Sequence, residues 1–182
     1  MTKLTAATPL EGRDVTHGDT RLTESLPGRL TWLAPWPGAE GALSEALQAA
    51  HGLRFPAPGQ VLEAGEARCI WHGRAQALLV GPEPAARLAD HGAVLDVTEV
   101  WAGLRLTGPA VPQVMARLTP VDMRPAQRVA GQTVRSLLAH MNAQVTAMPD
   151  GVEILVMRSM AGTAAHEIEE AMKSVAARME VG

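Results

Sequence analysis

The stretch from residue 104 to residue 122 reads LRLTGPAVPQVMARLTPVD, which is the pattern of a strand, a tight turn and a helix. A glycine at such a turn can hold a phosphate or expose a nucleophile, so Thr107-Gly108-Pro109 is the first candidate for a functional site. Proline has no N–H to donate, and Pro109 and Pro112 therefore remove two donors from the first helical turn. Since proline favours the first position of a helix, we interpret this stretch as a structural turn.

Upstream of this turn, hydrophobic patterning predicts a βαββαβ order. Strands are expected at 29–36, 68–72, 76–80 and 94–98, and helices at 39–51 and 83–90. Gly52 is expected to end the first helix, because glycine readily adopts the left-handed conformation of a helix C-terminus. Residues 53–65 contain several prolines and glycines and are predicted to be a loop.

Downstream, the pattern predicts a βαβββα order. Strands are expected at 100–106, 133–139, 143–147 and 152–157, and helices at 110–118 and about 163–179. The two halves, about 29–99 and 100–182, therefore resemble two copies of a split βαβ unit. The sequence predicts an α+β fold, with 29–182 as one domain made of these two subdomains. Residues 1–28 are polar and rich in turn residues, and are predicted to be an N-terminal arm that is ordered only if something holds it.

Composition excludes several classes of function. The 182 residues include 16 basic and 19 acidic side chains, for a net charge of −3. This balance argues against binding to nucleic acid or to an anionic membrane, which needs clustered Lys and Arg. No apolar stretch approaches the ~20 residues of a membrane span. Cys69 is the single cysteine, so no intrachain disulfide can form, and a reducing cytoplasm is the expected location.

The residues with potential chemistry are scattered. His166 and Glu170 are spaced to share one helix face, but the second histidine of a metallohydrolase motif is absent. Cys69 lies within a predicted strand and is expected to be a packed thiol. The carboxylates nearest the central turn are those of Asp96, Glu99 and Asp122, and nothing supplies a partner at defined spacing for acid–base work. We therefore assign no catalytic, cofactor-binding or metal-binding residue from the sequence.

Residues 94–123, VLDVTEVWAGLRLTGPAVPQVMARLTPVDM, resemble the gamma subunits of heterotetrameric sarcosine oxidases. The shared features are an Asp-Val-Thr strand beginning at Asp96, a strand that ends in Gly108-Pro109, and a helix that ends in a Leu-x-Pro-x-Asp motif beginning at Leu118. Segments 69–80, 131–139 and 156–159 also fit, so that the resemblance covers about residues 50–180.

The resemblance implies the folate-binding fold of the glycine-cleavage aminomethyltransferases. It implies a non-catalytic gamma subunit that supports assembly of a complex with alpha, beta and delta subunits. Such a complex oxidatively demethylates sarcosine to glycine and transfers the one-carbon unit to tetrahydrofolate. FAD, FMN, NAD and folate are then expected in the alpha and beta subunits and zinc in the delta subunit, with no cofactor in this chain.

One departure bears on the alternative, a stand-alone folate-binding protein or a folate-dependent aminomethyltransferase-like enzyme. Active transferases carry an acidic pair in the hairpin after the central loop, whereas the matching segment here, residues 136–149, reads SLLAHMNAQVTAMP and has no Asp or Glu. Proton transfer would then need another group, and Asp96, Glu99 and Asp122 are the candidates.

A subunit of a stable complex is expected to bury aromatic side chains and methionines against its partners. The candidate interface residues are Trp32, Trp36, Trp71 and Trp101. The competing interpretation of each is burial in the chain's own core, because strands bury alternate residues.

Overall fold

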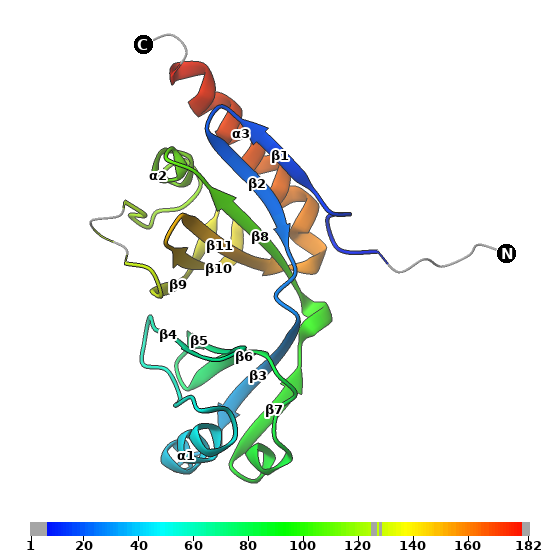
Figure 1. The fold of residues 1–182 in the computed structure, drawn as a ribbon, viewed down its shortest axis with the longest axis vertical. Coiled ribbons are helices and arrows are strands. Elements are labelled where there is room, and N and C mark those ends of the chain that lie inside the picture. The colour runs from blue at the N-terminus through cyan, green and yellow to red at the C-terminus, as the bar shows by residue number, and fades with distance from the viewer. Residues whose placement is uncertain (1–6, 125–126, 128, 180–182) are drawn as a thin grey trace, which may run out of the picture.

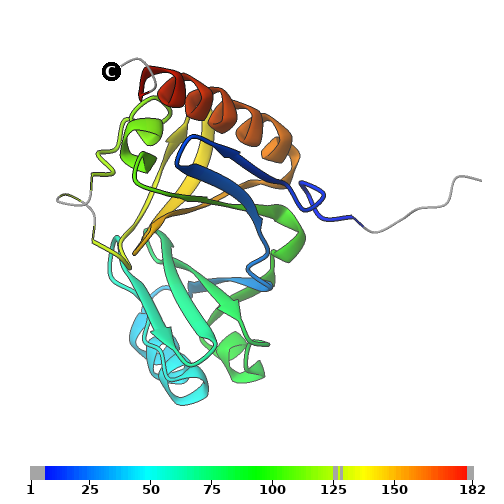
Figure 2. The same ribbon diagram turned by 45° about the horizontal axis from the view of Figure 1, so that its top comes forward.

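Two antiparallel sheets pack face to face, and each carries helices on its outer side (Figure 1). The computed structural model of the chain describes residues 7–124, 127 and 129–179. The turned view in Figure 2 shows the order of the layers, with α1 below the lower sheet and α3 above the upper one. No helix in the described part of the chain has the length and apolar character needed to cross a membrane.

The lower, five-stranded sheet has the strand order β4-β5-β6-β3-β7. Its elements are β3 (Arg29–Pro35), α1 (Glu40–His51), β4 (Val61–Ala64), β5 (Ala67–Gly73), β6 (Gln76–Gly81), the 3-10 helix η1 (Ala86–Asp90) and β7 (Gly92–Asp96). Gly52 ends α1 in the left-handed conformation, as predicted, with φ at 72°. The order β5-β6-β3-β7 is the split βαβ arrangement. The predicted loop 53–65 contains β4, which adds an edge strand to the expected four.

The upper, six-stranded sheet has the order β1-β2-β8-β11-β10-β9. Its elements are β1 (Asp14–His17), β2 (Thr20–Ser25), β8 (Trp101–Thr107), α2 (Val111–Met115), β9 (Thr133–Leu138), β10 (Met141–Met148), β11 (Gly151–Met157) and α3 (Ala161–Met179). The 3-10 helices η2 (Thr98–Val100) and η3 (Arg158–Met160) precede β8 and α3. Helix α2 (Val111–Met115) is shorter than the helix that the sequence predicts at 110–118.

The strand order of the second half does not repeat that of the first. Strands β9, β10 and β11 follow one another as antiparallel neighbours, and β8 pairs with β11. Tight connections between these three strands keep them adjacent in space, so the helix-linked strands β8 and β9 lie at opposite ends of the row. The α+β class is confirmed, whereas the expected two-fold repetition is not seen in the topology.

The prediction of an arm at residues 1–28 is wrong for residues 14–25, which form β1 and β2. Strand β2 pairs with β8, with Leu22 opposite Leu106. Leu22 is fully buried in the core beneath α2 and α3. The segment is short and polar, so its strand character comes from pairing with a strand some 80 residues away rather than from a local pattern.

The sequence Thr107-Gly108-Pro109 joins β8 to α2 as a structural turn. Gly108 has φ at 117°, and a Cβ at this position would lie 2.0 Å from the carbonyl oxygen of Asp19 in the β1–β2 turn. The Gly108 N–H donates to the carbonyl of Asp150 at 3.2 Å, so this donor is used within the fold. The geometry supports the interpretation made from the sequence.

Candidate functional site

Buried polar side chains join the two sheets along a seam. Gln144 in β10 is 1% exposed, and its Oε1 lies 3.1 Å from Nδ1 of His72 in β5. The Gln144 amide nitrogen donates to the carbonyl of Trp71 at 3.0 Å and to the hydroxyl of Thr133 at 2.5 Å. Because buried polar groups are costly unless paired, this network specifies one arrangement of the two sheets.

His72 is a structural residue of the seam. Burial is the main cause that lowers the pKa of His72 to about 4, and the nearby charge of Arg135 acts in the same direction. The imidazole lies edge-on to Trp101, with ring centroids 5.1 Å apart. A neutral histidine that is buried between an amide and an indole orients its neighbours and has no open path to a substrate proton.

An ion pair and an apolar cluster complete the seam. Arg68 in β5 binds Glu153 in β11, with Nη2 and Oε2 2.8 Å apart, and the hydroxyl of Ser25 donates to the other carboxylate oxygen at 3.3 Å. The apolar cluster between the sheets consists of buried side chains from both: Leu30, Ile70, Leu78, Val80 and Leu155. The two sheets therefore form one packed unit, and the surface beside their junction has a fixed shape.

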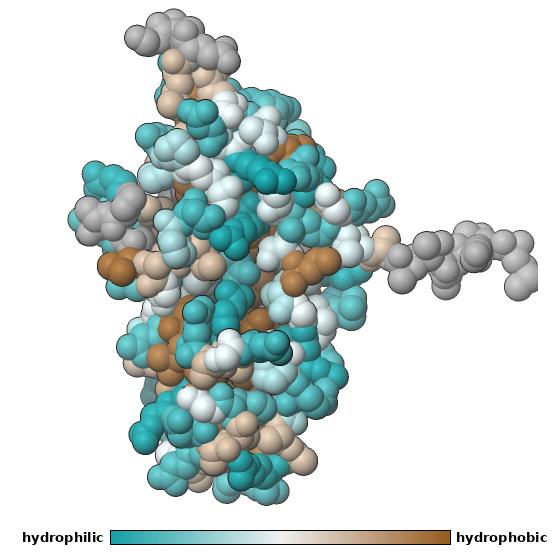
Figure 3. Space-filling model, in the orientation of Figure 1, coloured by the Kyte–Doolittle hydropathy of each residue, from teal (hydrophilic) through white to brown (hydrophobic). Residues whose placement is uncertain are grey.

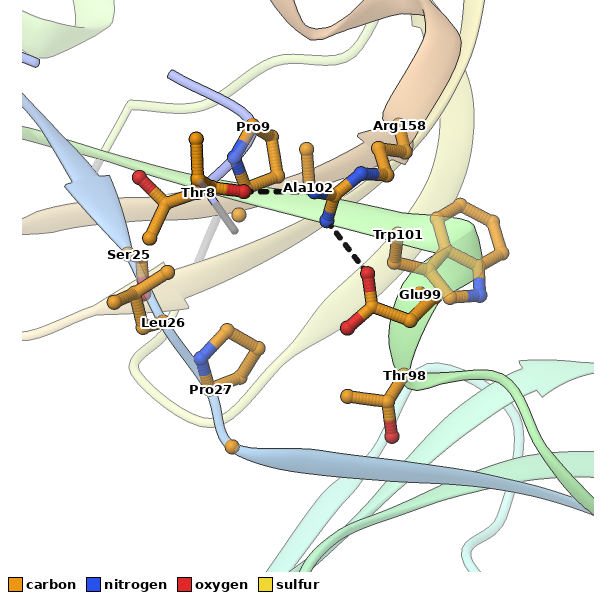
Figure 4. Close-up of a pocket in the computed structure, with 13 residues that line it drawn as sticks. Thr8, Pro9, Ser25, Leu26, Pro27, Thr98, Glu99, Trp101, Ala102 and Arg158 are labelled. Carbon is orange, nitrogen blue, oxygen red and sulfur yellow. Dashed lines mark hydrogen bonds and ion pairs between the residues drawn. The ribbon is translucent and has the colours of Figure 1, made fainter. Parts of the chain in front are cut away.

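A pocket of about 730 Å³ opens at the end of this seam, where the β2–β3 and β7–β8 connections pass each other (Figure 4). Arg158 Nη1 binds Glu99 Oε2 at 2.9 Å, and Arg158 Nη2 donates to the carbonyl of Ala7 at 3.0 Å. Trp101 forms part of the wall, together with Leu26 and Pro27. The volume suits a small ligand or a few side chains of a partner, and the charges at its rim already bind each other.

Apolar side chains, exposed except for the half-buried Trp101, lie on the elements that border this pocket, and two of them, Leu26 and Trp101, line it. We define the junction surface as six residues that lie in or next to the β2–β3 and β7–β8 connections or at the start of α3: Leu26, Leu95, Val100, Trp101, Met157 and Met160. Met157 stands directly opposite Trp101 in the β8–β11 register, so both side chains are on one face of the sheet. On the side of the molecule seen in Figure 3, hydrophobic residues form small areas among hydrophilic ones. Clustered exposed methionine and aromatic residues are typical of protein–protein contact sites.

The four tryptophans predicted as interface candidates do not share one surface. Trp32 and Trp101 pack against the apolar cluster between the sheets. Trp71 instead lines a groove of about 380 Å³ with Phe55 on the α1 side of the five-stranded sheet. Trp36 is exposed in the connection that leads to α1. Of the four, Trp101 belongs to the junction surface, while its exposed neighbours Leu26 and Met157 carry no signal in the local sequence.

Each of the three candidate carboxylates lies beside an arginine. Asp96 accepts hydrogen bonds from the Thr98 N–H at 2.9 Å and from Arg29 at 2.8 Å, and the pKa of Asp96 is lowered chiefly by the Thr98 bonds. Glu99 binds Arg158, as described above. Asp122 binds the nearby Arg124, with Oδ2 and Nη2 2.5 Å apart. The bonds from Thr98 and Arg29 favour the ionised form of Asp96, which makes it a poor general acid, and the structure does not bring the three carboxylates together.

The remaining predictions for chemical residues concern Cys69 and α3. Cys69 is buried, and burial raises the pKa of its thiol to about 12, which confirms the expected packed thiol. His166 is exposed on α3, and Glu170 binds Lys173 at 2.7 Å. Within the described ranges, no group of three His, Cys, Asp or Glu side chains is placed to hold a metal ion.

Comparison with solved structures identifies a chain that has the same fold. No protein-family model and no curated protein matches the sequence. Among solved structures, a chain of the heterotetrameric sarcosine oxidase from Corynebacterium sp. U-96, in complex with pyrrole 2-carboxylate, superposes with a TM-score of 0.78 and 23% identity. The match covers 94% of this chain and 96% of that chain. The resemblance seen in the sequence is thus confirmed at the level of the fold.

Proposed function

We propose that this chain is a non-catalytic subunit of a heterotetrameric complex of the sarcosine oxidase kind, in the position of the gamma subunit. The observation that carries the proposal is the whole-chain match, which includes almost every residue of both chains. A fold shared over 94% of this chain and 96% of the other supports an equivalent place in an assembly. Fold alone does not assign function, so the proposal also needs a surface that suits assembly.

The junction surface supplies this second support. Its exposed side chains belong to a rigid part of the molecule, because the seam beneath them is buried and hydrogen-bonded. A preorganised apolar surface loses little entropy when a partner covers it. The charged side chains at its rim, Arg158 and Glu99, already bind each other, so a partner need not supply a charged group to pair with them.

In this proposal the alpha, beta and delta subunits carry the chemistry. They hold FAD, FMN, NAD, folate and zinc, demethylate sarcosine in the cytoplasm and transfer the one-carbon unit to tetrahydrofolate. The present chain holds the assembly together. The arginine partners of Asp96 and Glu99 support this division, since they leave these carboxylates engaged within the fold.

The test is purification of the tagged full chain from its native host, followed by size-exclusion chromatography with light scattering and an absorption spectrum. We expect larger chains to co-elute, with flavin bands that bleach when sarcosine is added. An untagged strain is the control for background capture. A colourless single chain that survives washing would refute the proposal. Titration of that chain with tetrahydrofolate, followed by tryptophan fluorescence, would then test the stand-alone folate-binding alternative.

A further inference from the structure

One carboxylate holds the turn that precedes β1. Glu24, near the end of β2, accepts a hydrogen bond from the Thr8 hydroxyl at 2.7 Å. The same carboxylate accepts hydrogen bonds from the N–H groups of Leu10 at 2.9 Å and Gly12 at 2.6 Å. Hydrogen bonds to an ionised group are stronger than those between neutral groups. The shape of residues 8–12 therefore depends on a side chain that lies 12 to 16 residues further along the chain.

The backbone of this turn is in a conformation that its own residues do not favour. Glu11 has φ at 55°, in the left-handed region where a residue with a Cβ is strained, and Gly12 follows with φ at 74°. Strained backbone persists only where the surroundings hold it, and it is found in segments that switch between two states. Glu24 supplies this support, because it binds the N–H groups on both sides of Glu11.

The residues before this turn form one wall of the pocket of about 730 Å³. We call these residues, 7–9, the strap. The carbonyl of Ala7 accepts a hydrogen bond from Arg158 Nη2 at 3.0 Å, so that the guanidinium lies between the strap and Glu99 (Figure 4). Leu10 is buried against the core beside the six-stranded sheet and fixes one end of the strap.

We propose that the strap is a movable wall of this pocket, latched by Glu24 and Arg158. In the latched state the Thr8 hydroxyl binds Glu24 and the Ala7 carbonyl covers part of Arg158. In the released state the strap swings about the buried Leu10, and the pocket opens on the side of the guanidinium. Strain at Glu11 favours release and the polar contacts favour closure, so a few hydrogen bonds decide between the two states. The strap is a property of this chain by itself and does not depend on the proposed assembly.

Hydrogen exchange of the wild-type full chain is the first measurement. The Leu10 and Gly12 amides should be protected at least about tenfold less than the amide of Leu22, which lies inside the six-stranded sheet, because release of the strap is a local opening. Equal protection of all three amides would mean that residues 8–12 open only when the whole chain unfolds. That result would overturn the proposal.

The second measurement follows the modification of arginine side chains by phenylglyoxal, with each site resolved by mass spectrometry. In Glu24→Gln we expect Arg158 to react at least about threefold faster than in the wild-type chain, because the released strap no longer covers it. Arg105 is the internal reference, since its side chain is 41% exposed against 38% for Arg158 and it also binds a carboxylate, that of Asp150. Glu11→Gln is the matched control variant, because it removes a negative charge from the same turn, while the exposed Glu11 side chain takes no part in the Glu24 contacts.

A second pair of variants carries the test if Glu24→Gln does not fold. Thr8→Val removes one hydrogen bond from the latch, and Thr8→Ser keeps the hydroxyl. We expect Arg158 to react faster in Thr8→Val and at the wild-type rate in Thr8→Ser. Equal Arg158 rates in these two variants would overturn the proposal, and so would an equal rise of the Arg158 and Arg105 rates, which would indicate general loosening of the fold. Either result leaves the proposed function standing.

Discussion

Replacement of Gln144 by alanine should loosen the seam between the two sheets. The side-chain amide of Gln144 links β10 to His72 and to the carbonyl of Trp71, both in β5. Its third partner, the hydroxyl of Thr133, keeps other hydrogen bonds, to the hydroxyl of Thr146 at 2.9 Å and to a carbonyl. The variant therefore leaves the buried ring nitrogen of His72 and the part-buried carbonyl of Trp71 without this partner.

The magnitude follows from those two groups. A buried donor or acceptor that loses its partner costs about 1–3 kcal/mol, so the variant should lose about 2–6 kcal/mol of unfolding free energy. In a domain of this size each kcal/mol corresponds to about 2–4 °C in melting temperature. Water that reaches the His72 nitrogen would lower the cost, and we expect a value near the bottom of the range, about 3 kcal/mol.

The assay is thermal and urea unfolding of the purified chain, followed by circular dichroism and tryptophan fluorescence. Gln48→Ala is the control, because Gln48 is exposed on α1 and its side chain has no role in the seam. If Gln144→Ala melts at the same temperature as Gln48→Ala, the polar network does not hold the sheets together. The argument for a preorganised junction surface would then fail as well.

Three further predictions follow from other contacts. Gly108→Ala should destabilise the chain by more than about 2 kcal/mol, because a Cβ would combine a left-handed φ with contact at the Asp19 carbonyl; urea unfolding measures the loss. Burial lowers the pKa of His72 from 6.5 to about 4, so as the pH falls the imidazole becomes protonated in the unfolded chain before it does in the folded chain. The contribution of neutral His72 to the free energy of unfolding is therefore complete above pH 6.5 and declines as the pH falls towards 4. Urea titrations across this range should show the slope, and His72→Leu should lack it. Glu169→Gln weakens the bond from α3 to Arg13, which precedes β1, and should cost about 1–2 kcal/mol, with faster amide exchange in β1 as the local sign.

Local patterns in the sequence are enough to predict most of the individual elements. Helix α1 and its end at Gly52, the β5–β6 hairpin, α3 and the packed state of Cys69 all follow from periodicity and turn chemistry within a few residues. The structural role of the turn at Gly108 was also visible, because the prolines beside it remove N–H donors. These features depend on short-range geometry, which the order of side chains encodes directly.

The way in which these elements combine depends on contacts between residues that are far apart in the chain. The β1–β2 hairpin is held in the sheet by the pairing of β2 with β8, and no local sequence pattern predicts this pairing. The arginine that binds Asp96 is 67 residues away in the chain, and Gln144 and His72 are 72 residues apart. Such contacts depend on which faces of the two sheets are left to bury, so the seam and the junction surface exist only once both sheets have formed and packed together.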